Sequence, residues 1–127
     1  MATIDLPDVR AARSRITPYV RRTPLERSTT LSRMLGTNLY LKYESFQKTG
    51  SFKPRGAFNQ LRVLMDESDA DRFVGVSGGN FAQGLAYAGA VLGVSSACLV
   101  AAVVTARWLP SGDPAVVSEN RSAAVET

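Results

Sequence analysis

The stretch from Phe73 to Val100 decides the fold, and it reads FVGVSGGNFAQGLAYAGAVLGVSSACLV. The apolar run at 73–76 is typical of a buried parallel strand, and small residues at 77–79 end it. From 80 to about 92 the apolar side chains recur at helical spacing, and 97–100 is a second apolar run. Strand, turn, helix and strand in this order predict a βαβ unit with a right-handed parallel crossover. The predicted fold class is therefore α/β.

Upstream of this unit, the pattern predicts alternating helical and extended segments. We expect a helix over 6–20, an extended step at 23–25 and a strand over 38–43, where polar and apolar residues alternate. Residues 44–52 show no period and predict a loop, and a second helix is expected to begin near Pro54.

Downstream of about Val100 the pattern is lost. Residues 100–127 are rich in valine and alanine, contain no lysine and show no clear period. Two prolines and a polar end add turn character. We expect this segment to be an irregular tail.

Composition excludes several classes of chemistry. The chain has 127 residues, of which 45% are hydrophobic and 20% charged, with one cysteine and no histidine. A histidine-containing triad, a histidine-based zinc site and a thiolate cluster are thereby excluded, so no metal site is expected. No apolar run reaches the roughly 20 residues that span a bilayer, and the N-terminus carries an early acid instead of a secretory h-region. We expect a cytoplasmic protein with no membrane partner.

The net charge of +4 does not indicate nucleic-acid binding. The basic residues are spread along the chain and do not cluster with aromatic side chains in one stripe. Such arginines are typical of a solvated helix face, so nucleic acid is not an expected partner.

Lys53 is the first candidate for chemistry. It lies where a loop gives way to a helix, among Phe52, Pro54, Gly56 and Ala57, which are poor neighbours for a solvated side chain. A lysine beside a positive helix end and backbone N–H groups can act as an amine nucleophile. The alternative is a surface lysine that flanks a helix start.

The second candidate is the loop between the predicted strand and helix. Its glycines permit positive φ and close backbone approach, and the N–H groups that follow can bind an anion. Ser77 and Asn80 add side-chain donors. The alternative is a tight turn capped by Asn80, and the loop lacks the glycine spacings of dinucleotide and P-loop sites. A small nucleotide-binding α/β domain therefore stays a minor hypothesis.

Together the two loops resemble the β-family (fold type II) of pyridoxal-phosphate enzymes, in particular threonine and serine dehydratases and their serine racemase relatives. The resemblance covers roughly residues 5–99 and implies a partial three-layer αβα parallel-sheet fold, like that of the tryptophan synthase β-like enzymes. It also implies that a large domain begins before about residue 52 and a small domain occupies 53–99. The matching stretches are Arg22-Thr23-Pro24-Leu25, Leu41-Lys42-Tyr43-Glu44-Ser45-Phe46-Gln47-Lys48-Thr49-Gly50-Ser51-Phe52-Lys53-Pro54-Arg55-Gly56-Ala57 and Ser77-Gly78-Gly79-Asn80-Phe81-Ala82-Gln83-Gly84.

The resemblance implies a role for each matching residue. Lys53 would form the Schiff base with pyridoxal 5′-phosphate and then move the substrate's Cα proton. Phe52 and Asn80 would contact the cofactor, and Asn80 would form a hydrogen bond with the cofactor's 3′-oxygen. The substrate would be threonine or serine, losing its β-hydroxyl group, and a homo-oligomer is compatible with this reading. The loop expected to receive the substrate carboxylate consists of Ser77, Gly78, Gly79, Asn80 and Gln83.

The chain departs from the family pattern in three places. Phe81 stands where many relatives have histidine, so only an aromatic wall is expected there. Gly78 stands where serine racemases have a proton-transferring serine, which favours elimination over racemisation. The tail after about Val100 lacks the family's downstream cofactor-binding parts, which suggests a shifted frame and a truncated, inactive chain. The alternative is a non-catalytic remnant or interaction module that pairs with a full-length paralogue.

Overall fold

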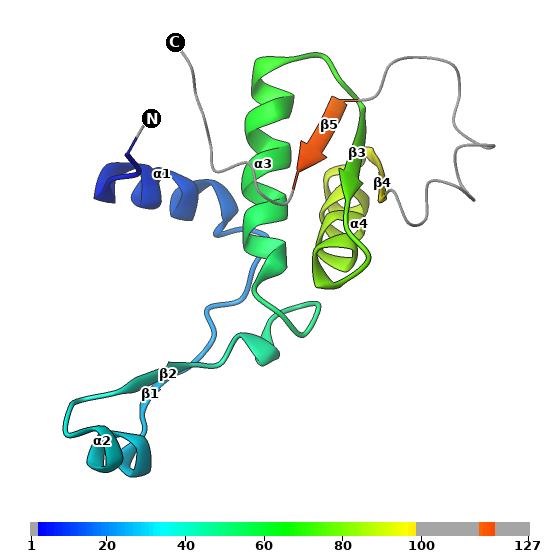
Figure 1. The fold of residues 1–127 in the computed structure, drawn as a ribbon. Helices are drawn as coiled ribbons and strands as arrows, with labels where there is room; N and C mark the ends of the chain where they lie inside the picture. Colours follow the sequence, from blue (N-terminus) through cyan, green and yellow to red (C-terminus); the bar gives the residue numbers. More distant parts are fainter. Residues whose placement is uncertain (1–2, 99–114, 119–127) are drawn as a thin grey trace.

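The computed structural model describes residues 3–98 and 115–118 of the chain (Figure 1). It contains a two-stranded antiparallel sheet, β1-β2, and a three-stranded parallel sheet in the order β4-β3-β5. None of the helices in the described ranges is long and apolar enough to cross a membrane. In chain order the elements are α1 (Leu6–Ile16), β1 (Leu25–Arg27), α2 (Thr29–Leu35), β2 (Tyr40–Lys42), the 3-10 helix η1 (Glu44–Phe46), α3 (Lys53–Glu67), β3 (Arg72–Val76), α4 (Asn80–Leu92), β4 (Ser95–Cys98) and β5 (Ala115–Ser118).

The βαβ unit predicted from the sequence is confirmed. β3 and β4 pair in parallel with Phe73 opposite Ser96, and α4 connects them. α4 ends at Gly93, whose φ of 74° is left-handed and therefore suits glycine. The α/β fold class is confirmed with it.

The expectation that residues 100–127 are irregular is wrong for Ala115–Ser118. These residues form β5, which pairs in parallel with β3 on the edge opposite β4, with Val74 opposite Val116. Two adjacent valines favour an extended backbone, and β3 offers its free edge as a hydrogen-bonding partner. That long-range partner is invisible in a local pattern. The rest of this tail, and the end of the apolar run predicted at 97–100, lie outside the described residues.

The N-terminal helix is shorter than predicted. α1 ends at Ile16, four residues before the expected end. Thr17 still has helical dihedrals as the C-cap, but Pro18 has no N–H group with which to continue the helical hydrogen bonds. Its N-cap is Asp5, and Asp5 and Asp8 each accept a hydrogen bond from the other's backbone N–H group, at 3.0 and 2.9 Å. This reciprocal capping box ties down the first turn.

The elements β1 and α2 are missing from the sequence-based prediction. α2 is short, but both of its ends carry signals: the Ser28 side chain caps the first turn, and Gly36 ends the helix with a φ of 64°. β1 pairs antiparallel with β2, with Leu25 opposite Lys42. A three-residue strand shows too little alternation to be recognised, and only its partner defines it.

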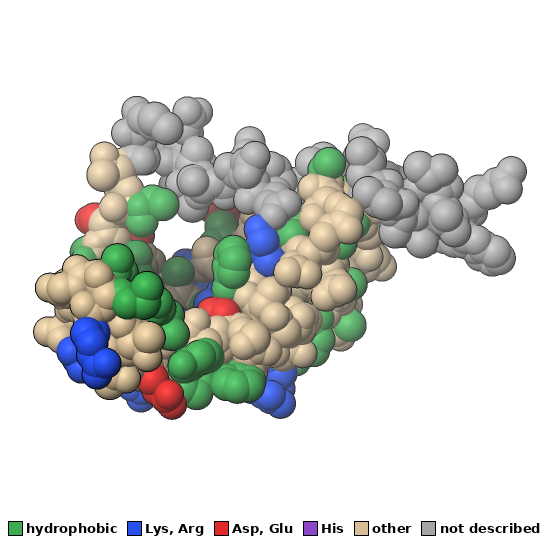
Figure 2. Space-filling model, turned by 60° about the horizontal axis from the view of Figure 1, so that its bottom comes forward, with side chains coloured by type: hydrophobic (Ala, Val, Ile, Leu, Met, Phe, Trp, Pro, Cys, Tyr) green, Lys and Arg blue, Asp and Glu red, His purple; other side chains and the backbone are tan. Residues whose placement is uncertain are grey.

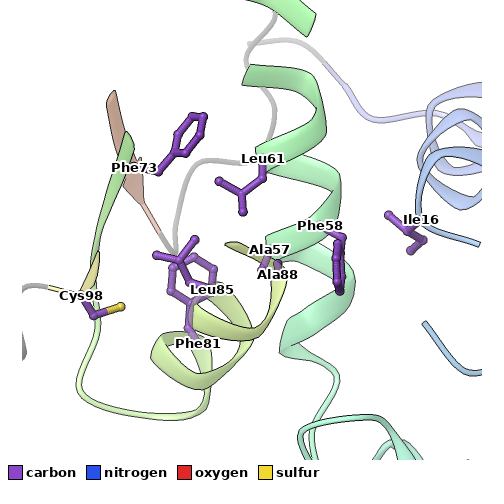
Figure 3. Close-up of a cluster of buried hydrophobic side chains, with 9 residues drawn as sticks. All are labelled: Ile16, Ala57, Phe58, Leu61, Phe73, Phe81, Leu85, Ala88 and Cys98. Carbon is purple, nitrogen blue, oxygen red and sulfur yellow. The ribbon is translucent and has the colours of Figure 1, made fainter. Parts of the chain in front are cut away.

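The hydrophobic core lies between α3, α4 and the strands β3 and β4 (Figure 3). Leu61, Phe73 and Leu85 point toward one another there, and each is at most 1% exposed. On the other side of α3, Phe58 faces α1 and its ring stacks on Tyr19 at a centroid distance of 4.8 Å. The buried apolar residues are Ile16, Ala57, Phe58, Leu61, Phe73, Phe81, Leu85, Ala88 and Cys98.

The strands β1 and β2, with α2 between them, form an arm over residues 25–42, here called the β1-β2 arm. A polar network, here called the joint, connects this arm to the first turn of α3. Its centre is the Glu44 carboxylate, which accepts two hydrogen bonds from the Arg55 guanidinium, both at 2.9 Å. Glu44 also accepts a hydrogen bond from the Thr23 hydroxyl at 2.5 Å. Gln47 is buried and bridges to the backbone of Arg21 with both ends of its amide. The joint therefore holds three segments that lie far apart in the sequence.

Electrostatics favours the ionised form of Glu44. The hydrogen bonds from Arg55 lower the pKa of the Glu44 carboxyl below its ordinary value, against the opposing effect of burial. The Thr23 hydroxyl and the positive charges of Arg55 and Lys42 lower this pKa further. Because the folded pKa is depressed, the stabilisation is complete above the unfolded pKa, roughly 4.3, and is lost as the pH falls through the folded pKa.

We therefore predict that Glu44→Gln lowers the free energy of unfolding by about 1–2 kcal/mol at neutral pH, because the charge-assisted bonds to Arg55 are lost. The difference from the wild type should shrink as the pH falls below the unfolded pKa of about 4.3 and should vanish below the lowered pKa of Glu44 in the folded protein. Urea unfolding at several pH values measures both effects. The exposed Glu26 supplies the control, Glu26→Gln, and an equal loss in that variant would contradict a special role for the joint.

Candidate cofactor-binding site

Lys53 is the first residue of α3, as the sequence predicted for a helix start near Pro54. Pro54 follows in the first turn, where its missing N–H group costs nothing. The turn before the helix uses Gly50 at a φ of 70°, and the Ser51 hydroxyl accepts a hydrogen bond from the Lys53 backbone N–H at 3.4 Å. Lys53 is half-buried, and its Nζ lies 5.1 Å from the ring centroid of the exposed Phe52.

The loop 77–79 follows the carboxyl end of β3 and leads directly into α4. The N-cap of α4 is Gly79, which forms no side-chain capping bond, and Asn80 is the first helical residue. The alternative of an asparagine cap is therefore wrong. The Gly79 N–H donates to the Ser77 hydroxyl and the Ala82 N–H donates to the Gly79 carbonyl, so the N–H groups of Asn80 and Phe81 are the ones that could bind an anion.

The glycines of this loop do not adopt the positive φ that the sequence analysis allowed for. Gly79 has a φ of −124°, and neither it nor Gly78 has a positive φ. The Ser77 hydroxyl accepts a hydrogen bond from the Gly79 N–H at 3.2 Å and so closes the turn. The space beside Gly79 is open, since a Cβ atom added there would meet no heavy atom within 4 Å.

The packing of α3 on α4 brings Lys53 to this loop. Gly84, one turn into α4, is buried against the start of α3. A Cβ atom added at Gly84 would lie 3.1 Å from the Lys53 carbonyl carbon and 3.3 Å from the Lys53 Cβ. The start of α3 therefore packs on α4 one helical turn after the loop 77–79, although Lys53 and Ser77 are 24 residues apart in the sequence.

These residues fit an anionic cofactor that carries an aldehyde. Lys53 supplies an amine, and the uncapped start of α4 supplies N–H donors. The space beside Gly79 is open, and Gly78, Asn80 and Gln83 are all exposed around it. The amine suits the aldehyde of pyridoxal phosphate, and the N–H donors suit an anionic group such as the carboxylate of an amino acid.

Phe81 lies elsewhere than the sequence suggested. We expected its ring to form an aromatic wall of the site, but it is 4% exposed and belongs to the hydrophobic core (Figure 3). As the second residue of α4 it faces the strands, because helical geometry turns it away from Asn80 and toward the stripe that contains Leu85.

Other features of the described residues do not compete with this site. Across 3–98 and 115–118, no group of three or more acidic or cysteine side chains could hold a metal ion. A cavity of about 530 Å³ lies between α1 and the joint, bordered by Ile16, Arg21 and Arg55. Neither Lys53 nor the loop 77–79 lines it.

Comparison with known proteins bears directly on this site. Residues 16–116 match the family described as pyridoxal-phosphate dependent enzyme. This range contains both Lys53 and the loop 77–79, and it extends into β5. No curated protein matched the chain.

Solved structures of similar proteins point the same way. A threonine deaminase from T.th. is 41% identical over 91% of this chain and 38% of its own, with a TM-score of 0.67. Maize serine racemase is 39% identical over 81% of this chain and 33% of its own, with a TM-score of 0.67. Serine racemase from Dictyostelium discoideum is 34% identical over 92% of this chain and 40% of its own, with a TM-score of 0.68.

The chain therefore spans 33–40% of the length of these three structures. The match nevertheless covers the lysine at the start of α3, the loop before α4 and the contact between the two helices. By sequence and by fold, the chain belongs to the family of pyridoxal-phosphate-dependent enzymes.

Proposed function

We propose that this chain provides the lysine-bearing part of a lyase that uses pyridoxal 5′-phosphate to eliminate the β-hydroxyl group of threonine or serine. The observation that carries this proposal is the position of Lys53 at the start of α3, packed against α4 just beyond its uncapped first turn. The similarity to threonine deaminase and serine racemase structures supports the class of substrate.

Lys53 is the residue that would hold the cofactor and move the proton. Its Nζ would hold the cofactor covalently through the aldehyde carbon. When bound, the cofactor would withdraw electrons from the substrate Cα and so make its proton acidic. The Lys53 Nζ would then accept that proton from the substrate Cα.

The loop 77–79 and the start of α4 would hold the substrate. Their N–H groups form a concentrated positive end that suits the α-carboxylate of an amino acid. Ser77 and Gln83 flank this end, and Asn80 would donate its amide hydrogen bond to the 3′-oxygen of the cofactor. With the carboxylate fixed, the Cα–H bond would point at Lys53 and not at solvent.

Gly78 favours elimination over racemisation. Racemisation needs a second group that delivers a proton to the opposite face of Cα, and glycine has no side chain to do so. Gly78 is exposed beside the open space at Gly79. Loss of the Cα proton would accordingly be followed by loss of the β-hydroxyl group, which takes up a proton and leaves as water, and the products would be a 2-oxo acid and ammonia.

We predict that Lys53 reacts with pyridoxal phosphate in preference to the other lysines of the chain. Incubation with the cofactor, reduction of the C=N bond with borohydride and peptide mapping should place at least about tenfold more label on Lys53 than on Lys42 or Lys48, because only Lys53 has an anion-binding helix end beside it. Lys53→Arg keeps the charge, removes the reactive amine and serves as the control. Equal labelling of all three lysines would contradict the proposed function.

The 127 residues by themselves should turn over threonine at least about 100-fold more slowly than a full-length threonine deaminase assayed alongside. About 60% of the chain of each of these related structures lies outside the match, and small errors in cofactor placement cost large factors in rate. Release of 2-oxobutanoate measures the rate. Comparable turnover would show that these residues position the cofactor unaided.

A second function, pairing with a full-length chain of the same family, is favoured by the β1-β2 arm. Apolar side chains are exposed on it, notably Leu25 at 61%, Met34 at 74% and Leu35 at 63%. Figure 2 shows such side chains at the end of the molecule formed by this arm. Exposed apolar clusters of this kind commonly mark interaction surfaces.

For this second function we predict that a tagged chain retains a full-length threonine deaminase in a pull-down, and that Met34→Glu weakens the interaction by about tenfold. The control is Val91→Glu, which changes an exposed apolar side chain on α4, away from the arm. Retention unaffected by Met34→Glu would rule out the arm as the contact surface.

A further inference from the structure

Gly84 makes the closest approach between α4 and the residue that bears the candidate amine. A Cβ atom at this position would lie 3.1 Å from both the Lys53 carbonyl carbon and the Pro54 nitrogen, and 3.3 Å from the Lys53 Cβ. All three distances are shorter than ordinary van der Waals contact. The neighbours on the α3 side are mainly backbone atoms, which cannot rotate away as a side chain can.

Helix propensity makes the presence of glycine here informative. In the interior of a helix glycine is less favourable than alanine, because it loses more backbone freedom on folding. α4 nevertheless has glycine at this position, where its backbone touches the start of α3. A steric requirement for contact with α3 accounts for that choice.

We infer that Gly84 is a positioning residue for Lys53: it sets the separation between the amine-bearing first turn of α3 and the anion-binding start of α4. This inference rests on the proposed role of Lys53. A methyl group at Gly84 would displace the Lys53 backbone by a few tenths of an ångström. Pro54 is buried and its ring is rigid, so the first turn of α3 would have to move as a unit.

The chain offers two matched controls. Gly89, also in α4, is more crowded than Gly84, but its added Cβ atom would meet Ser96 of β4, with the Ser96 Cβ at 2.7 Å. Gly89→Ala therefore disturbs packing without touching Lys53. Gly56 lies in α3, close to Lys53 in sequence, and an added Cβ atom would meet nothing within 4 Å. Gly56→Ala therefore adds a methyl group near Lys53 without crowding it.

The experiment measures how borohydride-fixed pyridoxal phosphate distributes among the lysines of the full 127-residue chain. The ratio of label on Lys53 to label on Lys48 is an internal measure of placement, since both lysines meet the same cofactor concentration. We expect Gly84→Ala to lower this ratio at least about threefold relative to the wild type. Gly56→Ala should leave it unchanged, and Gly89→Ala should leave it unchanged among folded molecules, which circular dichroism and thermal unfolding quantify.

The possible outcomes separate this inference from the proposed function. If the wild type labels its lysines equally, the proposed function fails. If the wild type prefers Lys53 and folded Gly84→Ala keeps the same ratio, the function stands and the role of Gly84 is overturned. A drop in Gly89→Ala as large as in Gly84→Ala would also overturn it, because loosened packing alone would then suffice.

A second variant guards against loss of the fold. Gly56→Ala should strengthen α3, because alanine replaces an exposed glycine within a helix. Should Gly84→Ala be unfolded, the labelling is repeated with Gly84→Ala combined with Gly56→Ala. A lowered ratio in the folded double variant supports the inference. Failure of the double variant to fold overturns it, because Gly84 would then serve the fold as a whole and not the placement of Lys53.

Discussion

The packing of α3 on α4 is the contact on which the rest of this structure depends. Its interior is apolar, with Leu61 of α3 and Leu85 of α4 both fully buried against Phe73 of β3. Burial of each such side chain is worth about 1.5–3 kcal/mol, so this small core supplies much of the available stabilisation. The same helix pair carries Lys53 at the start of one member, against Gly84 of the other. Core and site therefore share one interface.

The first turn of α3 is held from a second direction by the joint. Arg55, two residues after Lys53, forms a two-pronged ion pair with Glu44, and its guanidinium also donates to the Arg21 carbonyl at 3.1 Å. α4 thus limits the position of the turn by contact, and the joint limits it by directional hydrogen bonds. The proposed reaction of Lys53 with an aldehyde would benefit from such a rigid base, because reaction depends on placement.

The parallel pairing of β3 also indicates at which end of the sheet a ligand would bind. In open parallel sheets, ligands bind beyond the carboxyl ends of the strands, and the loop 77–79 follows that end of β3. Helix α4 begins there with its N–H groups uncapped. Membership of the pyridoxal-phosphate family is consistent with this geometry, since an enzyme of this kind needs an amine for the cofactor and an anion-binding element for an amino acid substrate.

The sequence by itself determined the elements whose signals are local. The apolar run at β3, the stripe of Phe81, Leu85 and Ala88 on α4 and the helix start at Lys53 all depend on spacing within a few residues, and the structure confirms them. Only tertiary structure decided the rest. β1 and β5 are too short to be recognised without their partners, and the contact between Gly84 and Lys53 joins residues 31 positions apart. Such features depend on which surfaces meet when the chain folds, and no local pattern contains that information.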